Sequence, residues 1–543
     1  MRGTVGSVLV HSWSDENVPH ESAARSPAQQ PLTYTSAAGR WTLLATVLGS
    51  ALAGIDATVV NVALPAIGAD LDADFTALQW TVSAYALTLA SFILLGGTLG
   101  DRFGRRRVFL IGVGWFAVAS GLCGLAVNAE MLIGARALQG VGAALLTPGS
   151  LSILQSSFRS KDRARAIGAW SGLGGVATAI GPLLGGWVVD VASWRWVFLI
   201  NLPLAAVVAL VALRHVPESH DPGADGSRAD WSGGVLGALA LAGLTFALIE
   251  SDAGAASVLP ALAVALLGAV LFWWRERRAP YPVLPLGVFA AGQFSATNAV
   301  TFFVYGGFGA LFFLLVVHLQ VVAGVGPVAA GSALLPVTVI MLLLSSRSGA
   351  LAARIGPRLQ MSVGPLVSAS GILLLARIGA DASYVLDVLP GVALFGLGLA
   401  IMVAPLTSAA LAAAPPEHAG MASGVNNAVA RTGGLLAVAG IPLLAGIGVD
   451  TYDSPAFADG YRQALWLSAA VLVGAGALAA LVVRNDLLLD EGEDDGDDVG
   501  DDDGEQGQRL AEGRAETSQL PHCAVGAPPL MGACDHEGKP CRR

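Results

Sequence analysis

Three ionisable side chains interrupt otherwise apolar stretches of this 543-residue chain: Asp56, Arg136 and Arg431. Charges are costly in hydrocarbon, so residues of this kind usually serve a function. If its segment spans a membrane, Asp56 lies about 22 Å past Trp41 in a core of about 30 Å. Arg136 lies about 8 Å past Met131 on a span of opposite direction. The two depths coincide, which predicts an ion pair.

Such a pair could move protons. Burial favours the neutral form of a carboxyl group, and a neighbouring guanidinium favours the ionised form. We therefore expect Asp56 and Arg136 to line a cavity in which the carboxylate exchanges a proton. The alternative is a static bridge that orients two helices.

Arg431 lies about 17 Å into its own apolar stretch. It could attract an anionic group of a substrate, or it could bind backbone carbonyls freed by the neighbouring Gly433 and Gly434. The sequence favours neither interpretation.

Two uncharged residues on the same stretches as the expected ion pair, Asn61 and Gln139, are further candidates for substrate contact or for a structural role. The sequence contains no recognisable catalytic triad, metal-ligand cluster or nucleotide-binding motif. We therefore expect no metal site, no cofactor and no enzymatic activity.

The stretch GTLGDRFGRRR (97–107) is a basic loop punctuated by glycines. Its glycines permit a tight turn, its aspartate suits the positive end of a helix, and its arginines can pair across the bundle. The residues concerned are Gly97, Gly100, Asp101, Arg102, Gly104, Arg105, Arg106 and Arg107. We expect a gate, and the alternative is charge that only sets topology. The Gly-Lys-Ser/Thr ending of a phosphate-binding loop is missing.

The stretch WSGLGGVATAIGPLLGGW (170–187) supplies small residues at a spacing that allows close helix packing. A proline in it removes a backbone donor and bends the helix. The candidate residues are Gly168, Gly172, Gly181, Pro182, Gly185 and Gly186. Packing and a hinge are equally compatible with this pattern.

Composition identifies the elements that carry these residues. The chain is 54% hydrophobic and 13% charged, whereas soluble domains carry about 25% charged residues. This nearly excludes soluble enzymes and nucleic-acid binders, and it predicts an all-α polytopic membrane protein. Fourteen apolar windows are long enough to span a bilayer, at 41–66, 79–99, 108–127, 131–154, 164–189, 196–213, 232–250, 257–274, 294–318, 328–347, 360–378, 384–411, 420–449 and 462–483.

An even number of spans puts both termini on one side of the membrane. The short loops on that side carry 16 Lys and Arg residues, against three on the other. Because basic loops stay inside, both termini are expected to be cytoplasmic.

An internal repeat relates the two halves. At one constant offset of 252 residues, Gly97 matches Gly349 and Arg102 matches Arg354, and three glycines of a later span also match. Two six-helix bundles (41–213 and 294–483) are then expected to flank an inserted helix pair (232–274). The remaining segments are an N-terminal cytoplasmic tail (1–40) and an acidic tail (484–543), expected to be disordered.

With these residues in view, the chain resembles the major facilitator superfamily, and within it the 14-helix drug:proton antiporters, over residues 41–483. The stretches that carry the resemblance are IDATVVNVALP (55–65), GTLGDRFGRRR (97–107), LIGARALQGVGAA (132–144), Gly168 with IGPLLGG (180–186), WRWVFLINLP (194–203) and LQVVAGVGPVAAG (319–331). Two positions depart from the pattern: Ala177 stands where the antiporter motif commonly has glycine, and Ala353 replaces the acid of the second-half loop.

The resemblance implies proton coupling at Asp56 and Arg136, gating by the 97–107 loop, and conformational switching at Gly181 and Pro182. The expected function is proton-driven export of an amphipathic drug or antibiotic by alternating access, in a bacterial plasma membrane. The proton-motive force replaces a cofactor, nucleic acid is not a partner, and the expected state is a monomer. The alternatives are a transporter dedicated to one metabolite, by export or proton symport, and a non-transporting membrane scaffold.

Overall fold

The computed structural model describes residues 31–221, 229–414, 419–452 and 454–488. Within these residues the chain is helical, with one isolated β-bridge between Leu32 and Phe158. Fourteen helices are long and apolar enough to cross a membrane. The first six spans are α1 (Ala37–Leu71), α2 (Phe75–Phe103), α3 (Arg105–Gly124), α4 (Ala129–Ser157), α5 (Ser160–Val191), and α6 (Arg195–Leu199) with α7 (Asn201–His215).

Eight further spans follow along the described chain. The next two spans are α8 (Trp231–Ile249) and α9 (Ala255–Arg278). The last six are α10 (Gly292–Val321), α11 (Pro327–Ser332) with α12 (Leu335–Ile355), α13 (Arg358–Leu375), the π-helical turn η4 (Tyr384–Val388) with α14 (Leu389–Ala412), α15 (Ala419–Leu444) and α17 (Ala456–Val482). Short turns complete the description: η2 (Ser251–Ala253), η3 (Leu286–Ala290), α16 (Val449–Tyr452) and η6 (Asp486–Leu488).

Polar side chains define where several of these helices begin. Ser36, Asp74 and Asn128 each accept a hydrogen bond from a backbone N–H three residues on, at the starts of α1, α2 and α4. Such caps satisfy donors that the first turn leaves free. The interiors of the spans are apolar, so their backbone hydrogen bonds close within each helix, as hydrocarbon requires.

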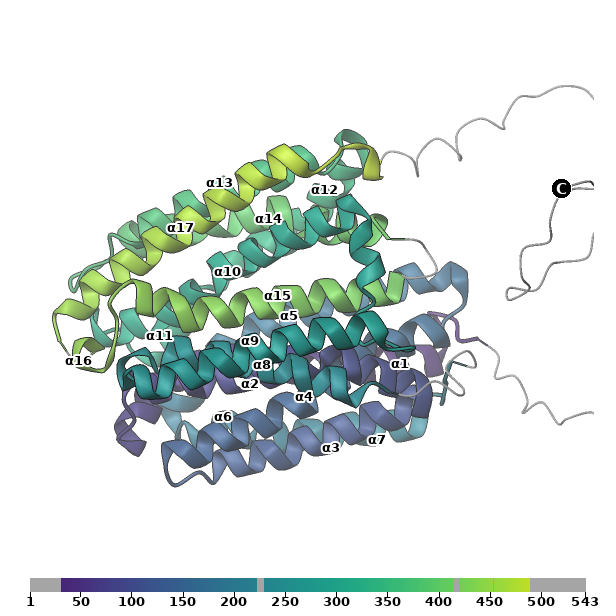
Figure 1. Cartoon of the computed structure of the whole chain (residues 1–543), viewed down its shortest axis with the longest axis horizontal. Helices are drawn as coiled ribbons and strands as arrows, with labels where there is room; N and C mark the ends of the chain where they lie inside the picture. The colour runs from purple at the N-terminus through teal and green to yellow at the C-terminus, as the bar shows by residue number, and fades with distance from the viewer. Residues whose placement is uncertain (1–30, 222–228, 415–418, 453, 489–543) are drawn as a thin grey trace, which may run out of the picture. The chain divides into compact units, whose positions relative to one another are not determined.

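The spans form two six-helix bundles plus an inserted pair. Figure 1 shows α1 to α7 in purple and blue, and α10 to α17 in colours that run from teal through green to yellow, with α8 and α9 where the two bundles meet. The same pairs of helices pack in both bundles: α1 packs on α5 as α10 packs on α15, and α3 packs on α4 as α13 packs on α14. This repeated packing follows the internal repeat of the sequence.

The inserted pair packs across the line where the bundles touch. Helix α8 contacts α2 of the first bundle and α15 of the second, while α9 packs on α8. Trp80 of α2 donates a hydrogen bond to Glu250 at the end of α8 over 2.8 Å. The two inserted helices therefore cover the α2–α15 contact as well as connecting the halves.

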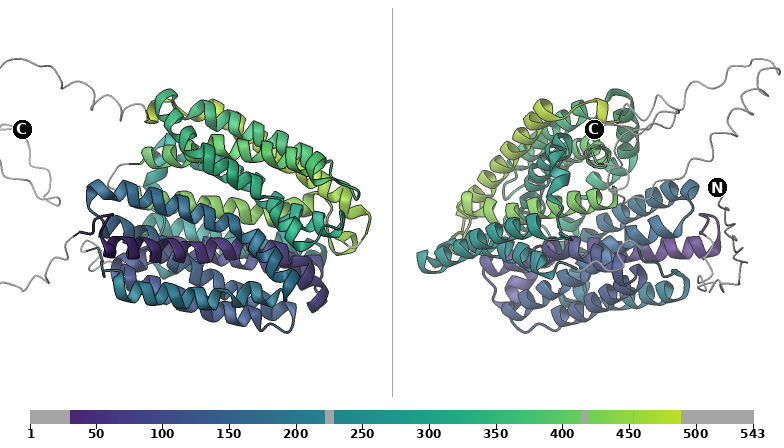
Figure 2. Two further views of the ribbon diagram at one scale, coloured as in Figure 1. Left: turned by 180° about the vertical axis from the view of Figure 1, so that it is seen from behind. Right: turned by 45° about the vertical axis from the view of Figure 1, so that its right-hand side comes forward.

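The bundles are joined near the end of the molecule that carries the α1–α2 loop. Gln79 of α2 donates to the carbonyl oxygens of Val438 and Ala439 of α15, over 2.6 and 3.2 Å. Gln320 of α10 donates to the Val62 carbonyl of α1 over 3.0 Å. The chain enters α1 and leaves α17 at the opposite end (Figures 1 and 2).

Every predicted window coincides with an observed span, but several boundaries were wrong. The window 196–213 is broken at Ile200, between α6 and α7, and 328–347 is broken between α11 and α12. Pro336 stands in the first turn of α12, where its missing N–H is tolerated. The window 420–449 runs too far, because α15 ends at Leu444, shortly before Gly446 takes a positive φ of 69°.

Candidate functional site

Asp56 and Arg136 form an ion pair inside the first bundle. Asp56 lies on α1 and Arg136 on α4, and Arg136 Nη1 donates to Asp56 Oδ2 over 2.5 Å. Both side chains are about 1% exposed or less. The pair predicted from depth is therefore present. In this conformation it is enclosed by protein and does not line a cavity, contrary to our expectation.

Two amide side chains hold the other oxygen of the carboxylate. Gln139, one turn after Arg136 on α4, donates to Asp56 Oδ1 over 2.8 Å, and Asn201 of α7 donates to the same atom over 3.0 Å. Ser120 of α3 accepts from both amides over 2.9 Å and donates to the Phe198 carbonyl. Four helices of one bundle thus supply a closed polar network around Asp56.

Backbone and aromatic groups surround Arg136. Its Nε donates to the Thr81 carbonyl over 3.0 Å, and its guanidinium carbon lies 4.3 Å from the centre of the Tyr85 ring. The Tyr85 hydroxyl donates to the Ala53 carbonyl of α1 over 3.1 Å. A cation over an aromatic face is stabilised by the ring quadrupole. Helix α2 therefore holds the guanidinium of Arg136 in addition to the contact with Asp56 of α1.

Sequence reasoning missed part of this network. Asn201 stands within WRWVFLINLP, a stretch quoted for its resemblance alone, and its polar side chain in an apolar window was an available signal. Ser120 offered no signal, because small hydroxyl residues are common in spanning helices. Gln139 joins the network, whereas Asn61 does not, and the buried Asn61 Oδ1 has no hydrogen-bond partner among the described residues.

Arg431 lies midway along α15, partly buried, and its Nε donates to Asn427 one turn earlier over 3.4 Å. The described residues offer it no carboxylate and no carbonyl within hydrogen-bonding distance. A Cβ on Gly433 would lie 2.3 Å from the Phe302 carbonyl, so this glycine allows the close packing of α15 on α10. The alternative in which Arg431 binds local backbone carbonyls is therefore not what the structure contains.

Residues 97–107 do not form the loop that we expected: they are the last turns of α2 and the first residues of α3, and Gly104 alone lies between the two helices. This α2–α3 turn is held by the segment that follows α7. Arg106 N donates to Glu218 Oε1 over 3.0 Å, and the guanidinium groups of Arg106 and Arg107 each lie 3.7 Å from Glu218 Oε2. Gly104 has φ of 105°, and a Cβ there would lie 2.8 Å from Glu218 Oε1. Glycine is therefore required at this turn.

The other charged residues of the α2–α3 turn contact partners that are close in sequence. Arg105 pairs with Asp101 over 2.8 Å, and Arg102 stacks on the Phe103 ring. The Asp101 carbonyl accepts from the Asp221 N–H over 2.8 Å. A Cβ on Gly97 or Gly100 would meet nothing closer than 3.7 Å. Among the described residues, the hydrogen-bond and ion-pair partners of this turn lie on α2 and in the segment that follows α7.

The glycines of α5 differ sharply along the helix. A Cβ on Gly168 or Gly172 would meet no atom within 4 Å. A Cβ on Gly181 would lie 2.2 Å from Thr58 Oγ1 of α1, and one on Gly186 would lie 2.4 Å from the Pro327 carbonyl of α11.

Two further positions extend this close packing. A Cβ on Gly185 would lie 2.9 Å from the Val59 side chain of α1. The Pro182 carbonyl faces Gly331 of α11, where a Cβ would lie 2.1 Å away. This half of α5 is therefore where the backbones of the two bundles meet.

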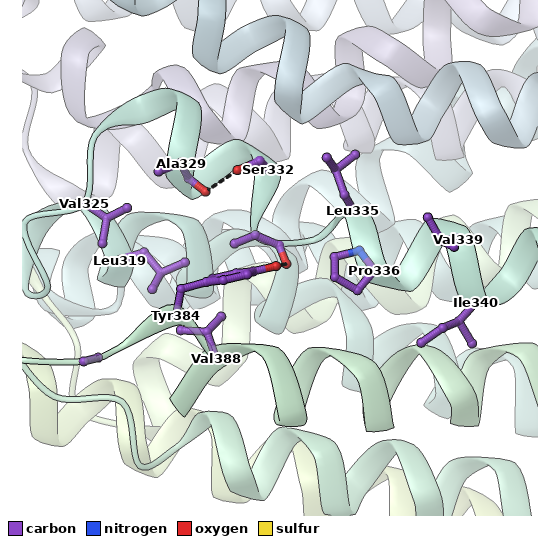
Figure 3. A pocket seen from close by; sticks show the side chains of 12 residues that line it. Leu319, Val325, Ala329, Ser332, Leu335, Pro336, Val339, Ile340, Tyr384 and Val388 are labelled. Atoms are coloured by element: carbon purple, nitrogen blue, oxygen red, sulfur yellow. Dashed lines mark hydrogen bonds between the residues drawn. The ribbon is translucent and has the colours of Figure 1, made fainter. Parts of the chain in front are cut away.

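A separate pocket of about 640 Å³ lies within the second bundle, between α10, α11, α12 and η4 (Figure 3). Most of the residues that line it are apolar, among them Leu319, Ala329, Pro336 and Ile340, and the Tyr384 ring lies across it. None of the predicted site residues lines it. Within the described ranges, no three His, Cys, Asp or Glu side chains are grouped so as to hold a metal. The three cysteines of the acidic tail lie outside the described residues.

Comparison with known proteins gives this geometry a context. The chain is 38% identical over 406 residues to the multidrug resistance protein Stp of Mycobacterium tuberculosis (strain CDC 1551 / Oshkosh), covering 73% of this chain and 74% of that protein. It is 37% identical over 447 residues to the tetracenomycin C resistance and export protein of Streptomyces glaucescens, covering 80% and 82%.

The fold also has solved counterparts. A POT family peptide transporter in an auto-inhibited form superposes with a TM-score of 0.62 at 17% identity, over 81% of this chain and 96% of that one. At that identity the likeness concerns the fold alone. The profile of the Major Facilitator Superfamily matches residues 46–438. The chain, with its two six-helix bundles and its inserted helix pair, belongs to the Major Facilitator Superfamily.

Proposed function

We propose that this protein exports amphipathic small molecules in exchange for protons, by alternating access across a bacterial plasma membrane. The observation that carries the proposal is the enclosed Asp56–Arg136 pair in the interior of a superfamily member. The names of its relatives, which refer to multidrug resistance and to antibiotic resistance and export, support the direction and the substrate class.

Asp56 is the proton-carrying group of this proposal. In its ionised form it accepts from Arg136, Gln139 and Asn201. Taking up one proton from the outer aqueous phase neutralises Asp56 and removes its attraction for Arg136. The guanidinium and both amides then need new partners, so the packing of α1 against α4 and α7 changes. Release of that proton to the cytoplasm restores the network.

Two motifs would convert this local change into movement of the bundles. The close contact of Gly186 and Pro182 with α11 supports a role for helix five in closing one face of the transporter. The Glu218 contacts of Arg106 and Arg107 support a role for the 97–107 loop in the conformational cycle.

The basic loops of the sequence support an orientation with both termini in the cytoplasm. In that orientation the joined ends of the bundles face outward. The domains of the proposal are 41–213, 232–274 and 294–483, between the tails 1–40 and 484–543. The transporter works as a monomer and requires the proton-motive force, the lipid bilayer and a small-molecule substrate.

The test is substrate-driven proton movement in everted vesicles, with the wild type and Asp56→Asn. We expect proton release from the vesicles on addition of a transported drug, and at least a tenfold loss in Asp56→Asn, because asparagine cannot carry a proton. The matched control is Asp70→Asn, which removes an exposed acid of the same helix that pairs with Arg195. Undiminished proton movement in Asp56→Asn would refute the coupling role of this carboxylate.

A further inference from the structure

Arg431 is a cation in the membrane interior without an acidic partner. It lies near the middle of α15 (Ala419–Leu444), and its single hydrogen bond within the described chain is the 3.4 Å contact with Asn427. A guanidinium carries five N–H donors, so most of its donors are unused. A charge in this position is costly unless something pairs with it.

No carboxylate of the described spans is free to pair with it. Asp56 is the acid near the middle of a span, and both its oxygens are taken by Arg136, Gln139 and Asn201. The other acids of the described spans lie within four residues of a helix end. The missing partner of Arg431 is therefore not supplied by this part of the chain.

Arg431 faces the region between the two bundles. Ala428, one turn earlier on the same face of α15, packs against the first-bundle cluster that includes Tyr85 and Leu89. Gly424, seven residues before Arg431 and on the same face of α15, lies against α2, where a Cβ would be 3.2 Å from the Leu94 side chain. The guanidinium thus lies where alternating access requires a transported molecule to bind.

Uncharged polar side chains line the face of α10 that packs on α15. Asn298, Thr301 and Tyr305 follow one face of α10 at a spacing of three and four residues, the spacing of one helix face. Asn426 of α15 donates to Asn298 over 3.1 Å and to Thr301 over 3.0 Å. Like Asn427, the hydrogen-bond partner of Arg431, these groups carry no negative charge, so the described part of the α10–α15 contact offers Arg431 no counter-charge.

We propose that Arg431 recognises an acidic group of the transported molecule, and that the substrates are amphipathic organic anions such as carboxylates, phenolates or enolates. The planar guanidinium matches a carboxylate in a bidentate manner, and one turn away on α15 Ala428 packs on an apolar cluster that includes Leu89. Lipophilic cations are disfavoured, because they meet a like charge and no acid. The inference rests on the proposed export function and narrows its substrate class.

The test uses two ligands with one ring system and opposite charge, anthracene-9-carboxylate and 9-(aminomethyl)anthracene. Their binding to the purified full-length protein in detergent is measured by fluorescence anisotropy at pH 7. We expect the carboxylate to bind at least tenfold more tightly than the amine, because a charge-assisted hydrogen bond stabilises one and repulsion disfavours the other. Arg431→Gln should abolish this preference, and Arg431→Lys should retain part of it.

The matched control is Arg462→Gln, which removes an exposed arginine paired with Asp459 near the start of α17 and should leave the preference unchanged. Equal binding of the two ligands by the wild type, a preference for the amine, or binding of neither would overturn the proposal. An unchanged preference in folded Arg431→Gln, as judged by gel filtration, would overturn it as well.

A transport measurement distinguishes a failure of this inference from a failure of the proposed function. If the carboxylate binds through Arg431 but no proton-driven efflux is seen in vesicles, the export mechanism fails and the assignment of Arg431 stands. If drugs are exported with loss in Asp56→Asn, but binding shows no dependence on charge, the assignment of Arg431 fails and export stands.

Discussion

Asn201 and Gln139 have the same role in the Asp56 network, since each donates an amide N–H to Asp56 Oδ1. A carboxylate in an apolar interior needs its lone pairs satisfied. Because Arg136 holds Oδ2, the two amides satisfy the second oxygen, and Ser120 orients both of them. The ionised form of Asp56 thus depends on three helices besides its own.

This dependence gives a prediction for Asn201→Leu. The substitution removes one hydrogen bond to the ionised Asp56 carboxylate and one to Ser120, and leaves the Gln139 amide as the remaining donor to Asp56 Oδ1 and Ser120 Oγ. We expect the free energy of unfolding to fall by about 1–3 kcal/mol, seen as a lower thermal midpoint of the purified protein. The comparison is Gln293→Leu, which loses an exposed amide contact with Val482 and should change the midpoint little. Equal midpoints for the two variants would contradict the role given to Asn201.

At the scale of elements, the start of α8 shows how an inserted helix is anchored. Asp230 is buried and caps α8, with Oδ1 accepting from the Gly233 N–H over 3.0 Å, from Ser232 over 2.6 Å and from Arg275 of α9 over 3.1 Å. Burial raises the pKa of Asp230, but the hydrogen bonds from Ser232, Gly233 and Arg275 outweigh it, and the pKa lies below its usual value. One carboxylate thereby joins both inserted helices.

A lowered pKa fixes the sign of the pH dependence. The stabilisation by ionised Asp230 is present above the unfolded-state pKa of about 3.9 and is lost as the pH falls through the lower folded-state value. Asp230→Asn keeps a good cap but loses the charge. We expect it to lower the thermal midpoint at pH 7 and to differ less from the wild type below about pH 4.

The control for this charge is Asp74→Asn, the equivalent change at the exposed cap of α2, which should have little effect at either pH. A deficit of Asp230→Asn that grew on acidification would show that the carboxylate is not stabilised in its ionised form.

The spans could be predicted from the sequence only where apolar length determines them. Apolar length fixes a span, so all fourteen were predictable, whereas the break at Ile200 depends on local packing that hydropathy does not record. The Asp56–Arg136 pair followed from depth along two helices. Its enclosure and its contacts with Ser120 and Asn201 did not, because they require the lateral order of α3, α4 and α7, which depth does not provide.

For the molecule as a whole, the close contact between the bundles depends on glycines, because a side chain at these positions would collide with the backbone of the other bundle. At Gly186 and Gly331 the backbone of α5 meets that of α11 so closely that a single Cβ would overlap a carbonyl. Moving a packed backbone costs more free energy than moving the end of a flexible side chain. The closed state of this face therefore requires both glycines.

Gly186→Val should prevent this closure. Because its Cβ would lie 2.4 Å from the Pro327 carbonyl, the bundles must separate there, and we expect efflux to slow at least tenfold. Reaction of a cysteine introduced as Ser332→Cys with a membrane-impermeant thiol reagent should become faster. Gly172→Val is the control on the same helix, where a Cβ meets no atom within 4 Å. Normal efflux in Gly186→Val would show that this contact does not limit the cycle.

The confinement of the Asp56 network to one bundle bears on how such a protein can diversify. Asp56 belongs to α1 and the side chains of its network come from α3, α4 and α7, whereas Arg431 and its partner Asn427 belong to α15. Recombination between related genes near the inserted helix pair would therefore exchange one set and keep the other intact. If Asp56 couples protons as proposed above, such an exchange would change the compounds that the transporter recognises and leave its proton coupling unchanged.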